Sequence, residues 1–218
     1  MTKYCINRRA LTVLLASTML LAGCLGTAAL NSNTFVKPAA PITALKVLYV
    51  QNNLVGNRGG TASLSGIGYE SLPKLLEDRV PLVLGLNKIS AQFNSIQKID
   101  GVPNNLITAL KWGGAESANA PLLTIQIING TVLRAMAGGA TDYHLTMQVT
   151  LFDSTGRTML WTGQFKNMLS IAMLGVVKFD NDFVDKMLKT VLEKMAFDEI
   201  IKLASGNAII PASATAVR

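Results

Sequence analysis

Hydrophobic and polar residues alternate most regularly in residues 143–152. The apolar positions are Tyr143, Leu145, Met147, Val149 and Leu151, and His144, Thr146, Gln148 and Thr150 lie between them. A period of two predicts a β-strand with one buried face. Asp153-Ser154-Thr155-Gly156 is typical of a turn, and residues 157–165 predict a strand that returns beside the first. We therefore expect a β-hairpin here.

Other stretches rich in Leu, Ile and Val predict further strands. Residues 44–51 predict a first strand that is bounded by polar residues. Residues 122–129 alternate imperfectly and predict a strand buried on both faces, which residues 131–136 continue. Asn129-Gly130 between them is typical of either a tight turn or a bulge. The chain is expected to form a sheet of about four strands.

Apolar residues spaced three and four apart predict helices between the strands and at the end of the body. Residues 71–97 are mostly helical in pattern. Pro73 fits the first turn, whereas Pro81 should kink or split the helix. Residues 101–114 predict a shorter helix or a loop.

A last helix is predicted after Asp180, Asn181 and Asp182, each of which is a good N-cap residue. Three acid–lysine pairs stand four residues apart in the favourable order: Asp182–Lys186, Asp185–Lys189 and Asp198–Lys202. The predicted fold class is α+β, with a mixed or antiparallel sheet and helices packed on one face. The predicted order is β-α-α-β-β-β-α.

The chain begins with a run that has the three parts of a secretory signal. Residues 1–9 contain three basic residues and no acidic one, residues 10–22 carry no charge, and small residues end the run. The uncharged stretch has 13 residues, fewer than the roughly 20 that a membrane-spanning helix needs. An exported protein is therefore favoured over one with a permanent transmembrane helix.

Leu21-Ala22-Gly23-Cys24 at the end of this run resembles the lipobox of bacterial lipoproteins. The resemblance implies cleavage between Gly23 and Cys24, and lipidation of the Cys24 sulfur with diacylglycerol, often with a third acyl chain on the new amino terminus. Two chains suffice for stable membrane anchoring. Leu25 stands where an aspartate retains such proteins in the inner membrane, so a periplasm-facing position on the outer membrane is expected. The alternative is a soluble secreted protein with an incidental cysteine.

Removal of residues 1–23 would change the chemistry that the composition allows. Cys5 would leave with the signal and Cys24 would be blocked, so the 195 remaining residues of the 218 would hold no disulfide and no cysteine ligand for a metal. Loss of three of the 20 basic residues leaves 17 against 13 acidic ones, a net charge of +4 instead of +7. These charges are scattered, which argues against a nucleic-acid partner.

The remaining chain divides into three parts. Residues 24–43 contain the lipid-attachment cysteine and a stretch of small and polar residues with two prolines, which predicts a linker that lifts the body off the membrane. Residues 44–204 form the predicted α+β domain. Residues 205–218 predict a flexible tail of small residues.

One segment of the body, residues 168–177, is almost entirely apolar. A buried strand or a plug beneath the last helix explains it most simply. The alternative is an exposed apolar loop that contacts a membrane or a partner protein, to which methionine is well suited. The candidate contact residues are Met168, Leu169, Ile171, Met173 and Leu174.

The hairpin and the helix after it are similar to small envelope-lipoprotein domains. The residues that carry this likeness are Asp142-Tyr143-His144-Leu145 and Phe152-Asp153 through Trp161-Thr162-Gly163. Comparable domains include the N-terminal domain of the Tol-system propeller protein and the curli-secretion and penicillin-binding-protein-activator lipoproteins. The resemblance implies a role in assembly, secretion or transport by binding other proteins.

No catalytic, metal or cofactor motif stands out. His144 is the only histidine and lies on the polar face of its predicted strand. No Gly-x-Ser-x-Gly occurs, and Ser63-Leu64-Ser65-Gly66 lacks the first glycine. The sequence thus favours a non-enzymatic, lipid-anchored binding or accessory protein of the cell envelope. The alternative is an envelope hydrolase acting on cell wall or lipid, which would require His144 to meet a serine or an acid in a pocket.

Overall fold

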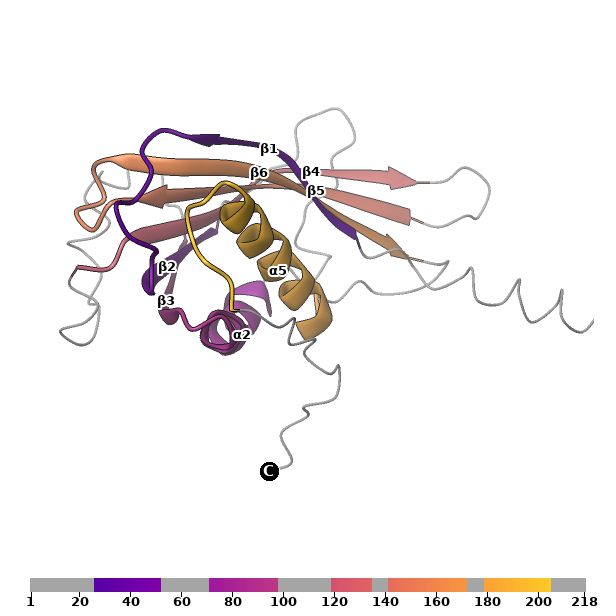
Figure 1. Cartoon of the computed structure of the whole chain (residues 1–218). Helices are drawn as coiled ribbons and strands as arrows, with labels where there is room; N and C mark the ends of the chain where they lie inside the picture. Colours follow the sequence, from indigo (N-terminus) through magenta and orange to yellow (C-terminus); the bar gives the residue numbers. More distant parts are fainter. Residues whose placement is uncertain (1–25, 52–70, 98–118, 135–140, 172–178, 205–218) are drawn as a thin grey trace, which may run out of the picture.

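The computed structural model describes residues 26–51, 71–97, 119–134, 141–171 and 179–204, which form one six-stranded sheet and two helices (Figure 1). The strands are β1 (Gly26–Thr34), β2 (Ala44–Gln51), β3 (Ser90–Gln97), β4 (Leu122–Arg134), β5 (Thr141–Phe152) and β6 (Met159–Ile171). The helices are α2 (Leu72–Leu86) and α5 (Asn181–Phe197). The strand order across the sheet is β1-β6-β5-β4-β2-β3. The expected α+β class is confirmed.

The sheet differs from the prediction in size and in order. It has six strands where about four were expected, and the described elements follow the order β-β-α-β-β-β-β-α. The sheet is mixed, because β2 runs parallel to both β3 and β4, whereas β4, β5, β6 and β1 are successively antiparallel. The predicted helix or loop at residues 101–114 lies outside the described residues.

The predicted hairpin is confirmed as β5 and β6. Half-buried and buried residues alternate from His144 to Val149, and Leu145, Met147, Val149 and Leu151 are all buried. In the turn, Asp153 Oδ1 accepts a hydrogen bond from Thr155 Oγ1 at 2.8 Å. Gly156 has a φ of 71°, which a glycine adopts without steric cost.

A helix and a strand replace the long helix expected over residues 71–97. Strands β2 and β3 are parallel neighbours, and α2 forms the crossover between them. The helix ends at Leu86, and Lys88 then adopts the left-handed φ of 60° that terminates helices. The prediction missed that residues 90–94 alternate with a period of two, in which Ala91 and Phe93 pack against the core.

Pro81 does not split α2 as predicted. The helix continues from Leu72 to Leu86 with Pro81 inside it, and Pro73 occupies the first turn as expected. Pro81 lies on the exposed side of the helix. The carbonyl group that loses its intrahelical hydrogen bond can therefore bind water, which reduces the cost of the proline.

Strand β1 occupies part of the region predicted to be a linker. Residues 26–34 pair antiparallel with β6, from Gly26 opposite Met168 to Thr34 opposite Trp161. The prediction of a linker over residues 24–43 is wrong for this part. The small and polar residues that indicated a flexible segment are also tolerated on an edge strand, because its outer backbone faces solvent.

Strand β4 passes through Asn129-Gly130 without turning back. Its pairing with β5 shifts register between Ile127 and Asn129, which leaves Ile128 as the extra residue of a bulge. Ile128 is accordingly 36% exposed, while Ile127 beside it is buried. Of the two alternatives left open by the sequence, the bulge is the one that occurs.

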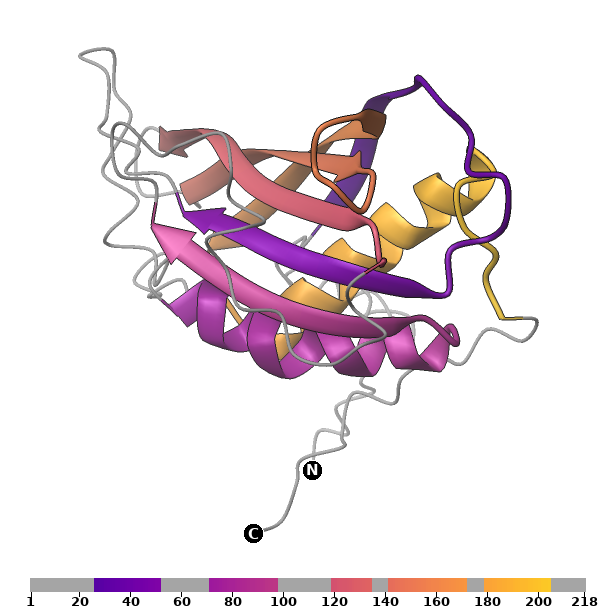
Figure 2. The same cartoon turned by 90° about the vertical axis from the view of Figure 1, so that its left-hand side faces the viewer.

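Both helices cover the same face of the sheet, as predicted (Figures 1 and 2). Inward-facing residues of β2, β4, β5 and β6 meet the apolar stripes of α2 and α5 in one core. The largest fully buried side chain is Trp161 of β6. A Cβ atom at Gly163 would lie 2.6 Å from the Trp161 ring, so glycine at this position makes room for the indole.

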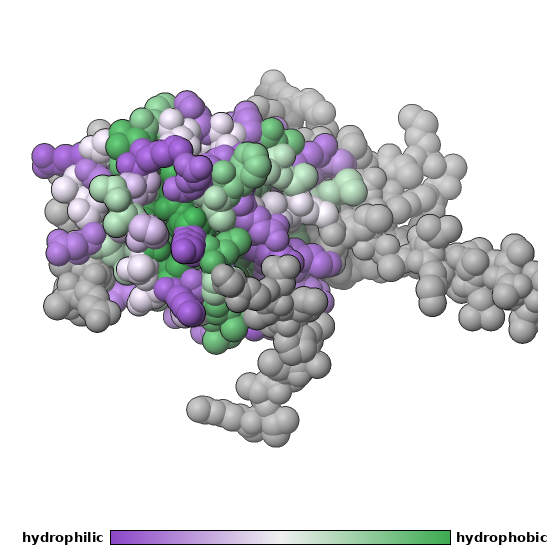
Figure 3. Space-filling view, viewed as in Figure 1, coloured by the Kyte–Doolittle hydropathy of each residue, from purple (hydrophilic) through white to green (hydrophobic). Residues whose placement is uncertain are grey.

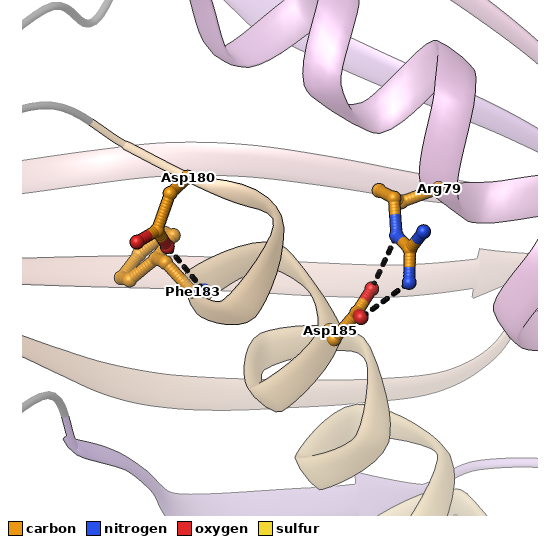
Figure 4. A network of polar contacts seen from close by, with 4 residues as sticks. All are labelled: Arg79, Asp180, Phe183 and Asp185. Carbon is orange, nitrogen blue, oxygen red and sulfur yellow. Dashed lines mark hydrogen bonds and ion pairs between the residues drawn. The ribbon is translucent and has the colours of Figure 1, made fainter. Parts of the chain in front are cut away.

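Helix α5 begins as predicted and makes a less expected contact with α2 (Figure 4). Asp180 is the N-cap, and its side chain accepts a hydrogen bond from the backbone N–H of Phe183 at 2.8 Å. Asp185 does not hold Lys189 but Arg79 of α2, whose Nε lies 2.7 Å from Asp185 Oδ1 and whose second nitrogen binds Oδ2. Hydrogen bonding to Asp185 raises the pKa of Arg79. Asp198 binds Lys194 instead of Lys202.

The Arg79–Asp185 pair should fix the contact between the two helices. Its side chains are only 12% and 17% exposed, so Asp185→Asn should lower the free energy of unfolding by about 1.5–3 kcal/mol, the usual worth of a hydrogen bond to a charged group. A double-mutant cycle with Arg79→Met, followed by urea unfolding, measures the coupling.

The matched control for that cycle is the exposed pair Lys189–Glu193 on α5, with side chains 61% and 54% exposed. Its coupling should not exceed about 0.5 kcal/mol, because solvent screens it. Equal coupling energies for the two pairs would contradict the assignment of Arg79–Asp185 as the stronger contact.

Candidate functional site

The face of the sheet opposite the helices carries a row of threonines. Thr124, Thr150 and Thr162 are register partners on β4, β5 and β6. Thr124 Oγ1 donates to the backbone oxygen of Thr150, and the hydroxyl oxygens of Thr150 and Thr162 are 3.2 Å apart. These bonds hold the hydroxyl groups in a fixed line across three strands.

A row of glutamines lies next to the threonines. Gln126, Gln148 and Gln164 are register partners on the same three strands, and all are half-buried. Gln148 Nε2 donates to Thr162 Oγ1 at 3.2 Å, which joins the two rows. We call these six residues the polar face. Its amide and hydroxyl groups supply hydrogen-bond donors and acceptors without charge, which suits recognition of a neutral or mixed surface.

Toward β2 the same face of the sheet is more buried and contains a lysine that sequence reasoning overlooked. Lys46 is 3% exposed, and its Nζ donates to the backbone oxygen of Ser154 at 3.3 Å. Burial lowers the pKa of Lys46. The sequence did contain a sign of this buried lysine, because Lys46 is the only charged residue in the otherwise apolar stretch 45–50. This contact ties the hairpin turn to β2.

The N-terminal end of the described chain is held tightly to the sheet. Gly26 pairs with Met168, and Thr27 Oγ1 donates to Asn167 Oδ1 at 2.8 Å. Asn167 is only 1% exposed, and a buried amide requires such a partner. The start of β1 therefore has a fixed position relative to β6.

Three of the five candidate residues of the apolar segment lie in a described strand, and the other two lie outside the described residues. Met168, Leu169 and Ile171 belong to β6 and pair with β5, and Met168 is half-buried. The strand interpretation therefore applies to residues 168–171. Met173 and Leu174 lie outside the described residues, as do Gly23 and Cys24. Lipidation and signal cleavage remain predictions.

The register brings His144 into a polar neighbourhood that the sequence did not identify. Asp142 pairs directly with Ser170, and His144 follows Asp142 by two residues, so the three positions share one face of the sheet. Serine, histidine and aspartate are the residues of hydrolase triads. A hydrolase also needs hydrogen-bond donors that stabilise an oxyanion. The backbone N–H groups of paired strands already bond within the sheet, so these strands do not supply such donors.

The acidic residues Asp180 and Asp185 have structural roles in the described chain. Asp180 caps α5 and Asp185 binds Arg79. Among the residues that the structure describes, no group of three or more His, Cys, Asp and Glu is placed to hold a metal ion. Within the same ranges, no helix is long and apolar enough to cross a membrane.

The face that carries the helices is a mixture of apolar and polar areas in the space-filling view (Figure 3). The exposed apolar side chains there include Leu82 and Leu86 on α2, at 55% and 47% exposure, and Phe197 at the end of α5, at 81%. Lys194 Nζ lies 4.6 Å from the centre of the Phe197 ring, a cation–π contact. These residues are spread over separate elements.

No family model matches the chain, and no curated protein matches its sequence. Among solved structures, it is similar to a PelC dodecamer from Paraburkholderia phytofirmans (TM-score 0.40, 10% identity, 74% of this chain and 94% of that one). It is also similar to lipoprotein GNA1162 from Neisseria meningitidis (TM-score 0.39, 11% identity, 71% and 99%). A third is protein XCC0632 from Xanthomonas campestris, of family DUF330 (TM-score 0.36, 14% identity, 77% and 89%). TM-scores this low carry no inference about function.

Proposed function

We propose that this protein is a lipid-anchored, non-enzymatic accessory protein of the bacterial outer membrane, which faces the periplasm and binds a protein partner there. The anchor is Cys24, supported by the resemblance of residues 21–24 to a lipobox and by the secretory pattern before it. No cofactor and no nucleic acid take part in this function.

The observation that carries the binding role is the polar face of β4, β5 and β6. Hydrogen bonds order four of its six side chains before any partner arrives: Thr124, Gln148, Thr150 and Thr162. A surface that is already ordered loses little side-chain entropy on binding. Fixed hydroxyl and amide groups also favour a partner whose own polar groups match them in position.

A photo-crosslinking amino acid on the polar face tests this role. With the crosslinker at Gln164, irradiation of intact envelopes should give one discrete adduct, because Gln164 is half-buried on the proposed contact surface. The measurement is mass spectrometry of the purified adduct. The control places the same crosslinker at Lys189, whose side chain is 61% exposed on α5.

The control position should give no discrete adduct, since α5 lies on the opposite face of the sheet. An adduct at Lys189 but not at Gln164 would place the partner elsewhere. Absence of any adduct at either position, in envelopes that contain the full lipidated chain, would contradict the binding role.

The second candidate function is an envelope hydrolase, favoured only by the shared face of Asp142, His144 and Ser170. A fluorophosphonate probe, which reacts with activated serines, distinguishes it. Labelling that disappears in both Ser170→Ala and His144→Ala would support the hydrolase. Absence of labelling in the folded, lipidated protein would leave the accessory role as the better account.

A further inference from the structure

Helix α2 lies along β3 at one edge of the sheet (Figure 2), and the outer side of its second half is apolar. Leu82 and Leu86 are 55% and 47% exposed there. Asp78 precedes Leu82 by four residues and is also exposed, so these three positions form one stripe along the helix. The opposite side of α2 packs into the core through Leu72, Leu76, Val80, Val83 and Leu84.

Gly85 belongs to the same stripe, because it follows Leu82 by three residues and Asp78 by seven. A Cβ atom at Gly85 would meet nothing within 4 Å, so the packing of the chain itself does not require a glycine there. Glycine favours a helix less than any residue except proline. Its benefit at an exposed position is that a second backbone can approach closely. We call Asp78, Leu82, Gly85 and Leu86 the outer stripe.

The charges at the two ends of the outer stripe are opposite in sign. At the start, Lys74 lies 3.2 Å from both Glu77 and Asp78, so two carboxylates share one cation and one negative charge remains. Beyond the end, Lys88 is exposed and forms no ion pair with any residue that the structure describes. The two exposed leucines lie between these ends. An antiparallel copy of the same helix would therefore place unlike charges together at both ends.

We propose that two copies of this protein associate through the outer stripe, with their α2 helices antiparallel about a two-fold axis. When Leu82 of one copy lies beside Leu86 of the other, the axis passes close to Gly85. In this register Asp78 faces position 90 of the second copy, so Lys88 of that copy is offset by two residues. At 1.5 Å per residue the offset is about 3 Å, which a flexible lysine side chain covers.

A second copy fits the outer stripe better than a lipid surface does. Anionic phospholipid headgroups attract cationic residues and repel a carboxylate such as Asp78, whereas Lys88 of a second copy neutralises it. The association needs no lipid on the chain. It also leaves the polar face free, because the helices and the polar face lie on opposite sides of the sheet. Two copies joined in this way would each present a polar face to a partner.

Disulfide formation between copies tests the association. The full chain carrying Gly85→Cys is oxidised in intact envelopes and separated on non-reducing gels. Near the axis, the two Cα atoms should come within the roughly 4.4–6.8 Å that a disulfide requires. The matched control is Lys189→Cys on α5, where the native side chain is 61% exposed. Gly85→Cys should give several-fold more dimer. Both variants keep Cys5 and Cys24, so the control also corrects for disulfides through these residues.

Charge reversal tests the antiparallel register. In the Gly85→Cys chain, Asp78→Lys or Lys88→Asp alone should lower the dimer yield several-fold, because like charges then meet. The two reversals together should restore the yield, since unlike charges face each other again. Aspartate tolerates the left-handed φ of 60° at position 88. Circular dichroism checks that each variant is folded.

Three results would overturn the association. Equal dimer yields from the folded Gly85→Cys and Lys189→Cys chains would mean that random collision explains both. A disulfide from position 85 to a different protein would give the outer stripe another occupant. Failure of the combined reversal to restore the dimer would exclude the antiparallel register. None of these results depends on lipid at Cys24 or on an adduct at Gln164, so the proposed function is tested separately.

Discussion

Cys24→Ser should release the protein from membranes and abolish incorporation of labelled fatty acid. The expected change is nearly complete, because two or three acyl chains supply the attachment and each buried methylene contributes about 0.8 kcal/mol. Membrane flotation and metabolic labelling with a palmitate analogue measure the two effects.

The control for this change is Leu25→Asp, which keeps the thiol. It should remain lipidated but move from the outer to the inner membrane in a host with enterobacterial-type sorting. Labelling that persists in Cys24→Ser would contradict the assignment of the lipid to this residue.

Trp161→Ala should cause the largest loss of stability of any single core substitution in the sheet. The side chain is completely buried, and its ring lies against Gly163 and 6.4 Å from the Phe165 ring centre. Its Nε1 also donates to Asp198 Oδ2 at 2.8 Å, which ties β6 to the end of α5. Removal of a buried tryptophan typically costs about 3–5 kcal/mol. Urea unfolding followed by circular dichroism measures it.

Trp161→Phe separates the hydrogen bond from the packing. It should cost less than Trp161→Ala, because a ring still fills most of the space. Burial alone would raise the pKa of Asp198, but hydrogen bonds from Lys194, Ser32 and Trp161 outweigh it and hold the pKa below its usual value. A carboxylate with a lowered pKa stabilises the fold above its unfolded pKa of about 3.9, and this contribution is lost as the pH falls through the folded value.

The effect of Trp161→Phe should therefore depend on pH in a defined direction. The difference in unfolding free energy from the original protein should be largest near neutral pH. It should shrink only as the pH falls below the unfolded pKa of about 3.9 and through the lower pKa of folded Asp198, where the carboxylate becomes protonated. A difference that stays constant with pH would mean that the bond to Asp198 contributes little and that ring volume accounts for the loss.

Local patterns predicted those elements whose faces are clearly divided between core and solvent. The β5–β6 hairpin and α5 were placed correctly, since one has strict alternation and a strong turn and the other has a regular apolar stripe behind Asp180. Strand β3 was missed because only three residues separate it from α2. The helix is terminated there by the left-handed φ of Lys88, a backbone angle that a lysine in the sequence does not indicate.

The candidate site shows the same division. The sequence identified His144 as a lone polar-face histidine, but the proximity of Asp142 and Ser170 follows from the pairing of two strands. In the same way, Thr124, Thr150 and Thr162 form a row only because the register aligns them across three strands. Long-range register cannot be read from alternation in a single strand, since alternation fixes only which face a residue occupies.

The sequence by itself determined the fold class, the hairpin, the capped last helix and the predicted lipid attachment at Cys24. Each depends on residues that lie close together along the chain. The tertiary structure decided that residues 26–34 form an edge strand on β6 and that Arg79 holds Asp185. Both depend on residues more than 100 positions apart, whose contact free energy exists only once the core has assembled. For that reason the segment predicted as a linker became part of the sheet, directly beside the proposed anchor.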